Sequence, residues 1–411
     1  MATVTAVTTV EEPVALRGGD WRPVRSRQRG TLLLVVLLTG LIYGAVVAIT
    51  VHRYDDNVSA LIVAGKTVVV KQYPGSPGRH IVIYRYDSYD GLGYYYIAGN
   101  PFMRAPNIGD ALRYQRIGYP LLVWAVSLGR RDWQPAVMVA VNMAAVLTIA
   151  LLAAAIIRRY APGASSWWAL ACAVNPALLI GVRDDLIEPL LTALALAGLL
   201  LYLRGRVAWA ALVFAVALLT REVGILFLLP LLVAELAARR LGRLVVLALS
   251  VAPYLIWERV VARVIGQSST VTVEHNFQPL FVGMRLALAG LPHAPAWKNI
   301  HFPSIVAAMA VVVAALAVAA WQARRRYDVM LGGIIAHCTA ALFGGYVIWQ
   351  GYRSAPRVFG GVYPLLIFVY LLYRRRNKGF APLVALVALL TVYVFLTQVI
   401  LAPTQSYYVT P

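Results

Sequence analysis

Two carboxylates stand among six tyrosines in residues 84–102, the densest group of chemically capable side chains in the sequence. A carboxylate that aromatic rings and lipid headgroups partly exclude from water has a raised pKa and can accept a proton as a general base. Asp87 and Asp90 are the candidates, and Gly91 beside Asp90 permits a close backbone approach. The structural alternative is an aromatic belt at a membrane surface in which Asp90 caps a helix, and the pattern leaves both open.

Arginines near the ends of apolar runs could bind a phosphate, because the guanidinium group is always charged and can hold two oxygens at once. Arg221 precedes Glu222, and Arg353 and Arg357 stand four residues apart, so they would share one face of a helix. Any one of these arginines could instead form an ion pair or extend its charge to the membrane surface. The candidates are Arg113, Arg116, Arg183, Arg221, Arg353 and Arg357.

Two further groups could bind ligands. The run Arg183, Asp184 and Asp185, with Glu188 just after it, could hold Mg²⁺ or Mn²⁺, or could be a solvated loop whose charges pair with each other. His337 lies in an apolar run and is predicted to be packed and hydrogen-bonded. Cys172 and Cys338 also lie in apolar runs, so they are predicted to be small buried apolar side chains.

The surrounding sequence is that of a membrane protein. Of its 411 residues 61% are hydrophobic and only 13% charged. Several apolar runs approach the roughly 20 residues that cross a bilayer as a helix, and none alternates as a strand would. The net charge of +20 could suggest nucleic acid, but the basic residues form short clusters between apolar runs, so no nucleic-acid partner is expected.

These runs predict an all-α polytopic membrane protein with about eleven transmembrane helices. Residues 1–30 form a basic tail, which the positive-inside rule places in the cytoplasm, with the carboxyl terminus and residues 404–411 outside. The clusters at 158–159, 204–206, 239–243, 324–326 and 374–378 then fall inside as well. The predicted spans are 31–51, 135–157, 166–182, 189–203, 207–220, 223–238, 244–257, 303–321, 329–349, 358–373 and 380–401.

Two long outer loops are predicted, 52–135 and 258–303. In the first, the β-branched runs 67–73 and 80–86 flank a Pro- and Gly-rich turn and suggest a small β-hairpin. The apolar run 117–128 is too short for a span and indicates an interfacial or re-entrant helix, and 94–98 looks like the start of another helix along the membrane surface.

Four short motifs resemble the GT-C type membrane glycosyltransferases. The first outer loop carries YDGLGYYYIAGNP at 89–101 and YQRIGYPLL at 114–122, and later segments carry LTRE at 219–222 and YRSAPR at 352–357. The overall plan of the chain is also similar to that family, so the resemblance covers residues 31–411.

The resemblance implies a transfer reaction outside the cytoplasm, at a bacterial plasma membrane. Such enzymes move a sugar from a polyprenyl-phosphate carrier to a glycan, lipid or protein acceptor, inverting the anomeric centre in one displacement. A first-loop aspartate is their candidate base, and it matches Asp90. Residues 52–89 lengthen this loop relative to the family, so Asp87 is a rival. We expect Arg116, Arg183, Asp184, Arg221, Glu222, Tyr352, Arg353 and Arg357 to bind substrate, and His275 and Asn276 could contact an acceptor sugar.

Two other functions are compatible with the sequence. A flippase or transporter of lipid-linked glycans would be expected to carry charged or broken helices near the middle of the membrane, whereas most charges here lie in loops or at helix ends. A membrane scaffold without catalysis would make the loop carboxylates dispensable. A phosphate-cradling glycine loop and zinc-ligand spacing are both missing from the sequence, which disfavours a cytoplasmic nucleotide-driven mechanism.

Overall fold

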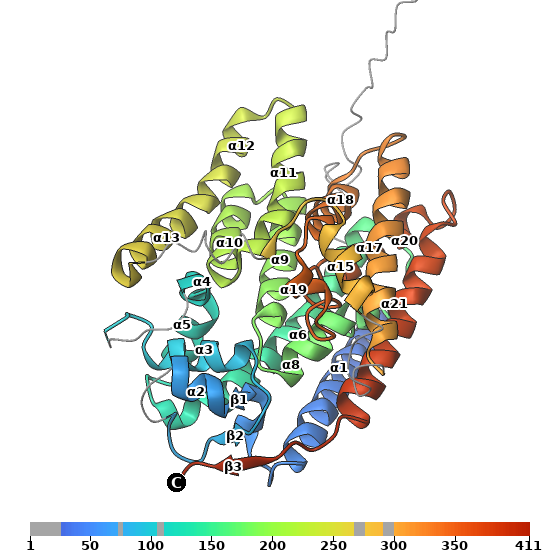
Figure 1. The fold of residues 1–411 in the computed structure, drawn as a ribbon. Helices are drawn as coiled ribbons and strands as arrows, with labels where there is room; N and C mark the ends of the chain where they lie inside the picture. Colours follow the sequence, from blue (N-terminus) through green and yellow to red (C-terminus); the bar gives the residue numbers. More distant parts are fainter. Residues whose placement is uncertain (1–25, 73–76, 105–110, 267–275, 291–299) are drawn as a thin grey trace, which may run out of the picture.

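The computed structural model describes residues 26–72, 77–104, 111–266, 276–290 and 300–411 (Figure 1). Helices dominate, and three short strands are present. The elements are α1 (Ser26–His52), η2 (Val58–Ile62), β1 (Ala64–Gly65), α2 (Lys66–Gln72), β2 (Val82–Tyr84), α3 (Asp90–Gly99), α4 (Ala111–Gln115), α5 (Gly118–Val126), η3 (Arg131–Trp133), α6 (Gln134–Tyr160), α7 (Trp168–Ala173), α8 (Pro176–Arg183), α9 (Glu188–Leu203), α10 (Val207–Thr220), η4 (Glu222–Gly224), α11 (Ile225–Ala237), α12 (Leu241–Ala248), η5 (Leu249–Val251), α13 (Ala252–Ile265), α15 (Val282–Gly290), α17 (Phe302–Ala323), α18 (Val329–Leu342), α19 (Tyr346–Trp349), α20 (Val362–Tyr373), α21 (Phe380–Phe395), the π-helix η7 (Leu396–Ile400) and β3 (Tyr407–Val409).

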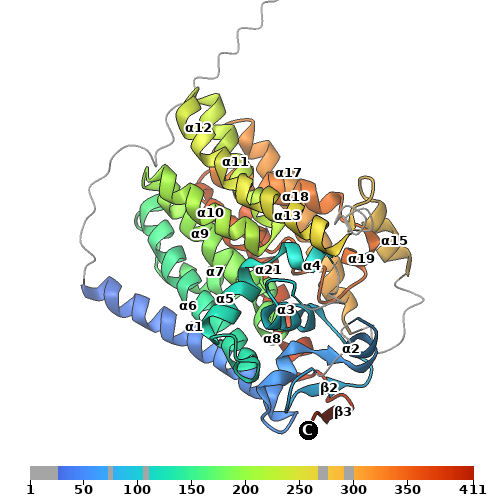
Figure 2. The same ribbon diagram turned by 90° about the vertical axis from the view of Figure 1, so that its left-hand side faces the viewer.

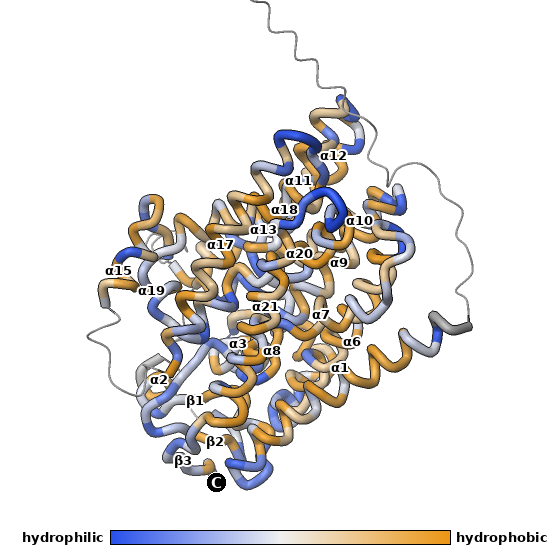
Figure 3. Tube along the Cα trace, turned by 90° about the vertical axis from the view of Figure 1, so that its right-hand side faces the viewer, coloured by the Kyte–Doolittle hydropathy of each residue, from blue (hydrophilic) through white to orange (hydrophobic). Residues whose placement is uncertain are grey.

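Helices lie over all eleven predicted spans, but they differ in length. Five helical segments of the described chain are long and apolar enough to cross a bilayer, as expected of a membrane protein. Four shorter apolar helices, α9, α10, α18 and α20, accompany them. Figure 3 shows hydrophobic residues along the helices and hydrophilic residues gathered in the loops at the upper end of the view. The five segments are Arg29–His52, Arg131–Tyr160, Leu241–Ile265, Phe302–Ala323 and Phe380–Ile400.

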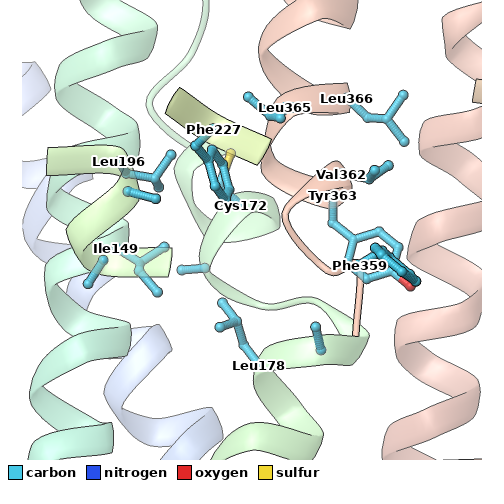
Figure 4. Close-up of a cluster of buried hydrophobic side chains, with 14 of the residues drawn as sticks. Ile149, Cys172, Leu178, Leu196, Phe227, Phe359, Val362, Tyr363, Leu365 and Leu366 are labelled. Carbon is cyan, nitrogen blue, oxygen red and sulfur yellow. The ribbon is translucent and has the colours of Figure 1, made fainter. Parts of the chain in front are cut away.

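The interior is a continuous apolar core around α6, which contacts α1, α7 and α9. Figure 4 shows Cys172 within this core, and both Cys172 and Cys338 are buried and free, as predicted. His337 is fully buried, its Nδ1 lies 2.8 Å from the Gly333 carbonyl oxygen, and its ring packs edge-on against Phe227. The prediction of a packed, hydrogen-bonded histidine is therefore confirmed.

The predicted hairpin is wrong in its first half. Residues 67–72 are helical in α2, and 73–76 lie outside the described residues. The second half forms β2, which pairs in parallel with β1 and antiparallel with β3 from the carboxyl-terminal segment. Figure 2 shows β2 and β3 together, although residues 81 and 410 are 329 positions apart in the chain. The sheet therefore fastens the carboxyl-terminal segment to the first loop.

The predicted single helix over 166–182 is broken into α7 and α8. The helix α7 ends at Ala173, and Asn175 caps α8, because its side-chain oxygen accepts from the backbone N–H groups of Ala177 (3.1 Å) and Leu178 (3.2 Å). Pro176 at the first position of α8 gives up no helical hydrogen bond there. As expected, the run 117–128 yields only the nine residues of α5, far too few to cross a bilayer.

The two ends of the molecule have different compositions. The sheet, α2 and α3 gather at one end, the lower one in Figure 1, which we call the sheet end. At the opposite end, called here the arginine end, α6, α9 and α20 finish and α18 begins, and these termini line one cavity. The arginine end carries the clusters Arg158 and Arg159, Arg204 and Arg206, Arg324 to Arg326, and Arg374 to Arg376.

Candidate functional site

Asp90 is the first residue of α3, at the sheet end. A Cβ atom added to Gly91 would lie 2.5 Å from the Asp184 carbonyl oxygen and 2.9 Å from that of Ile62, so only glycine allows this helix to start against the α8–α9 turn. The close backbone approach predicted at Gly91 is confirmed. The helix-cap interpretation of Asp90 is wrong, because the cap residue is Tyr89 and no side-chain cap bond forms.

Asp90 belongs to a chain of ion pairs that we call the Asp90 network. Its two carboxylate oxygens each accept one charged hydrogen bond of 3.1 Å, from Arg113 and from Arg357. Arg357 also donates to Glu188 at 2.5 Å, and Arg221 donates to the same Glu188 oxygen. The side chains of Glu188, Arg221 and Arg357 are each at most 5% exposed, whereas that of Asp90 is 24% exposed. The network therefore runs from a buried triad to a carboxylate that is open to solvent.

A second set of contacts, the Asp87 network, lies beside the first. Arg353 donates to Asp87 at 2.6 Å, and Gln405 from the carboxyl-terminal segment donates to the same oxygen at 2.9 Å. The Nε atom of Arg353 is 3.5 Å from Asp184, whose other oxygen accepts from Arg183 at 2.8 Å. The structure thus brings the predicted site residues Asp87, Arg183, Asp184 and Arg353 together.

Tyr89 connects the two networks. Its hydroxyl accepts from Arg357 at 3.1 Å, and the guanidinium carbons of Arg353 and Arg357 both lie 5.1 Å from the centre of its ring. Residues 352–360 form turns rather than the helix that would place Arg353 and Arg357 on one face. From this turn Arg353 reaches the Asp87 network and Arg357 reaches the Asp90 network.

The remaining predicted residues lie around this centre. Arg116 binds Glu222 through two hydrogen bonds of 2.9 and 2.6 Å, as a separate pair. The ring of Tyr352 stacks on the ring of His301, with 4.0 Å between the ring centres. The guanidinium carbon of Arg353 lies 5.3 Å from the centre of the Tyr352 ring. Burial lowers the pKa of His301 to about 4, with the charge of Arg353 adding to the effect, so this histidine is neutral at pH 7.

The electrostatics of the two aspartates differ from the sequence expectation. Burial raises the pKa of Asp90, but the charges of Arg113 and Arg357 lower it by more and hold it well below its usual range. Burial likewise raises the pKa of Asp87, and Arg353 and Gln405 lower it below the usual value. The expected raised pKa is therefore wrong for this arrangement, because each carboxylate is paired with arginine.

Cavities distinguish the two aspartates. A cavity of about 200 Å³ opens beside Asp90 and is also lined by Ser88, Tyr89 and Arg113. The cavity beside Asp87 measures about 20 Å³. Since one water molecule requires roughly 10–15 Å³ by such a measure, the second space holds about one water, whereas the first accommodates a larger group.

Two of the three carboxylates at 184–188 are paired with arginine. Asp184 and Glu188 already accept hydrogen bonds from arginines, whose charges would repel a cation. Burial raises the pKa of Asp185 well above its usual value, which disfavours the charged form that binds a cation, and its Oδ1 lies 3.3 Å from the Asn142 amide. Among the described residues, no three His, Cys, Asp or Glu side chains come together as a metal site would require.

Sequence reasoning missed Gln405, gave Glu188 a different role, and placed Asn276 at the site. Glu188 was a candidate cation ligand, but it holds Arg221 and Arg357, which only the fold could reveal. Gln405 reaches Asp87 from a segment predicted to be exposed. Asn276 lies next to α19 instead, where its carbonyl oxygen accepts from Gly345 at 2.7 Å. His275 lies outside the described residues.

Comparison of the chain with protein-family models, with curated proteins and with solved structures finds no match.

Proposed function

We propose that this protein is a membrane glycosyltransferase that moves a hexose or pentose from a polyprenyl-phosphate carrier to a hydroxyl group of a glycan, lipid or protein acceptor. The observation that carries the proposal is the Asp90 network, in which a carboxylate beside an open cavity is joined to three arginines. A base that faces space for an acceptor and fixed positive charge for a leaving phosphate are the two requirements of this reaction. The first-loop motif resemblance supports the same assignment.

In the proposed reaction the acceptor hydroxyl oxygen attacks the anomeric carbon from the side opposite the carrier. The bond between that carbon and the carrier phosphate oxygen breaks, and its electron pair leaves with the phosphate. The acceptor proton passes to the Asp90 carboxylate. The products are an inverted glycoside and the carrier phosphate, whose added negative charge Arg113 and Arg357 stabilise.

The low pKa of Asp90 gives the arginines a second role. A carboxylate that pairs with two arginines is a weak base, so the free site is unreactive. A carrier phosphate that takes hydrogen bonds from Arg113 and Arg357 weakens their hold on Asp90 and raises its pKa. The donor thereby activates the base, and the carboxylate becomes reactive only when the sugar is bound.

Asp90 is preferred to Asp87 as the base. The cavity beside Asp87 has room for about one water, and Gln405 occupies the oxygen that Arg353 also contacts. Asp87 instead orients Arg353. Because Asp184 and Glu188 are paired with arginines, arginine supplies the positive charge in the proposed reaction.

The topology proposed with this function has eleven spans, with the shorter helices α9, α10, α18 and α20 included among them. The arginine end then faces the cytoplasm, and the sheet end, with Asp90, faces outward. Reporter fusions to residue 411 should report an external location. A cytoplasmic signal would contradict both the count and the side of the reaction.

Incubation of the purified protein with a panel of radiolabelled polyprenyl-phosphate sugars tests the activity. We expect release of the unglycosylated carrier phosphate and transfer of label to acceptor, and loss of both in Asp90→Asn. A parallel assay in sealed vesicles measures movement of the intact carrier across the bilayer. Movement without cleavage would replace the transferase by a flippase.

A further inference from the structure

A cavity of about 420 Å³ lies at the arginine end, between the ends of α6, α9 and α20 and the start of α18. The 27 residues of α6 span roughly 40 Å and separate this cavity from the sheet end, where Gln134 at the other end of α6 contacts Ala98 of α3. The cavity is therefore distinct from the candidate glycosyl-transfer site.

Positive charge dominates the wall of this cavity. Arg374, Arg375 and Arg376 are exposed, and Arg159 and Arg326 are half-buried. The one acidic residue on the wall is Asp328. We refer to this cavity, lined by Arg159, Arg326, Asp328, Arg374, Arg375 and Arg376, as the arginine pocket.

Asp328 does not compensate this charge. Its Oδ1 caps α18 by accepting from the N–H groups of Met330 (2.8 Å) and Leu331 (3.2 Å), and its Oδ2 accepts from the Tyr373 hydroxyl at 2.6 Å. Within the described part of the chain, no ion pair joins Asp328 to Arg326 or to the three arginines after Tyr373. Asp328 thus joins the start of α18 to the end of α20, and Arg326 and Arg374 to Arg376 line the pocket beside it.

An apolar groove is lined mainly by residues that follow closely after the pocket residue Ala164 in the chain. Ala164 lines the arginine pocket, whereas Trp167 and Trp168 line a groove of about 440 Å³ with Ile42 and Ala171. The groove wall is almost entirely apolar, and Trp167 is 44% exposed. Tryptophan pairs of this kind mark the depth at which lipid headgroups meet acyl chains.

We infer that the arginine pocket and the groove together bind one anionic glycerophospholipid, with its phosphate among the arginines and an acyl chain along Trp167 and Ile42. Arginine forks bind phosphate oxygens in pairs, and basic pockets between helix ends recognise anionic headgroups. The groove favours a lipid over a free phosphate, because a soluble anion would gain nothing from an apolar wall. The inference does not depend on the proposed transferase activity.

Lipid retention by the full-length protein tests this inference. The protein is exchanged into nanodiscs of mixed phosphatidylglycerol and phosphatidylcholine, released, and analysed by native mass spectrometry for retained lipid. We expect preferential retention of one phosphatidylglycerol, and at least a tenfold loss of that preference in the double variant Arg326→Gln with Arg374→Gln. The matched control, Arg204→Gln with Arg206→Gln, removes two charges from the same end outside the pocket and should retain the preference.

Three further measurements test the binding mode and distinguish a lipid from a free phosphate. Trp167→Ala should weaken lipid retention while leaving the arginines intact, and Arg374→Lys should give an intermediate loss, because it keeps the charge without the fork. Inorganic phosphate at millimolar concentration should not displace the lipid. Equal losses in the pocket and control variants, or full displacement by phosphate with no effect of Trp167→Ala, would overturn the inference.

Discussion

Arginine is placed in opposite surroundings at the two ends of this molecule. At the sheet end Arg221, Arg353 and Arg357 are buried and each contacts a carboxylate. At the arginine end Arg374 to Arg376 are exposed, and the nearby Asp328 is engaged elsewhere. Buried arginine must be paired because an isolated charge is costly to remove from water, whereas exposed arginine can remain free to meet membrane anions.

This difference suggests two kinds of binding. At the sheet end an incoming phosphate must compete with carboxylates that already bind the arginines. Binding would therefore break some of these ion pairs, and it favours a ligand whose charge is strong and well oriented. At the arginine end a phosphate would meet Arg374 to Arg376, which are exposed and lie beside an Asp328 carboxylate that is engaged elsewhere. The first arrangement suits a reaction that has to be switched on by its substrate, and the second suits a standing contact with the bilayer.

The largest expected effect comes from Asp90. Asp90→Asn keeps the shape of the side chain but cannot accept a proton, so glycosyl transfer should fall roughly 10²- to 10⁴-fold while binding of carrier lipid persists. Asp87→Asn is the matched control and should cost less than about tenfold, since its cavity excludes an acceptor. Equal and near-normal transfer by both variants, in monodisperse preparations that bind carrier lipid, would remove the base from the mechanism.

The buried pairing itself can be broken at Glu188. Glu188→Gln leaves Arg221 and Arg357 facing a neutral partner, and breaking a buried pair of this kind costs about 3 to 5 kcal/mol. The thermal unfolding midpoint in detergent should fall accordingly. Asp56→Asn breaks the exposed contact with His52 and should cost less than about 1 kcal/mol. Similar midpoints for the two variants would show that burial does not set the strength of the Glu188 pairs.

The third comparison is between arginine and lysine. Arg221→Lys and Arg353→Lys keep a positive charge but lose the second hydrogen-bonding arm, so turnover should fall about tenfold in each. Arg85→Lys, an exposed arginine over Tyr86 at the same end, serves as control. Wild-type turnover in both test variants would exclude the two arginines from phosphate binding.

Acid should protonate Asp87 and Asp90 and so leave the arginines of the sheet end without charged carboxylate partners. Arginine charges hold the pKa of Asp87 and Asp90 below the value of about 3.9 typical of unfolded chains. These pairs therefore stabilise the fold fully above that pH, and the stabilisation is lost as the pH falls toward the folded-state pKa. The unfolding midpoint should decline as the pH is lowered from about 5 to about 3, and the decline should be shallower in Asp87→Asn. An unchanged slope would contradict the pairing.

The smallest effect is expected from chelation. Arginines occupy Asp184 and Glu188 in the positions where a cation would have to bind. Glycosyl transfer should therefore be the same, within error, before and after treatment with EDTA. Loss of activity that Mg²⁺ or Mn²⁺ restores would show that substrate binding frees these carboxylates for a metal.

The sequence predicted which segments supply the site, because apolar runs and arginine clusters follow directly from the membrane environment. It could not predict which arginine meets which carboxylate. Arg353 and Asp87 are 266 positions apart, and their contact depends on how the turn at 352–360 packs against the first loop. The low pKa of Asp90 was missed for the same reason, since the aromatic sequence around it indicated burial but not the two arginines that outweigh burial.

Local propensity also misled in one place. Residues 67–70 are all β-branched, yet they lie in α2, and the antiparallel partner of β2 comes instead from β3. A pattern of β-branched residues reflects a half-buried surface as much as a strand, so tertiary pairing decided the outcome.

The pairing of β2 with β3 sets an order for biogenesis. Thr410 and Ile81 are 329 residues apart, and every helix from α3 to α21 is synthesised between them. At about 5–20 residues per second the ribosome needs roughly 20 to 60 s to cover that distance. During that interval one edge of β2 is open and Asp87 lacks Gln405. The sheet can therefore be completed only after the helices from α3 to α21 have been synthesised, so β2–β3 pairing is a late step of folding.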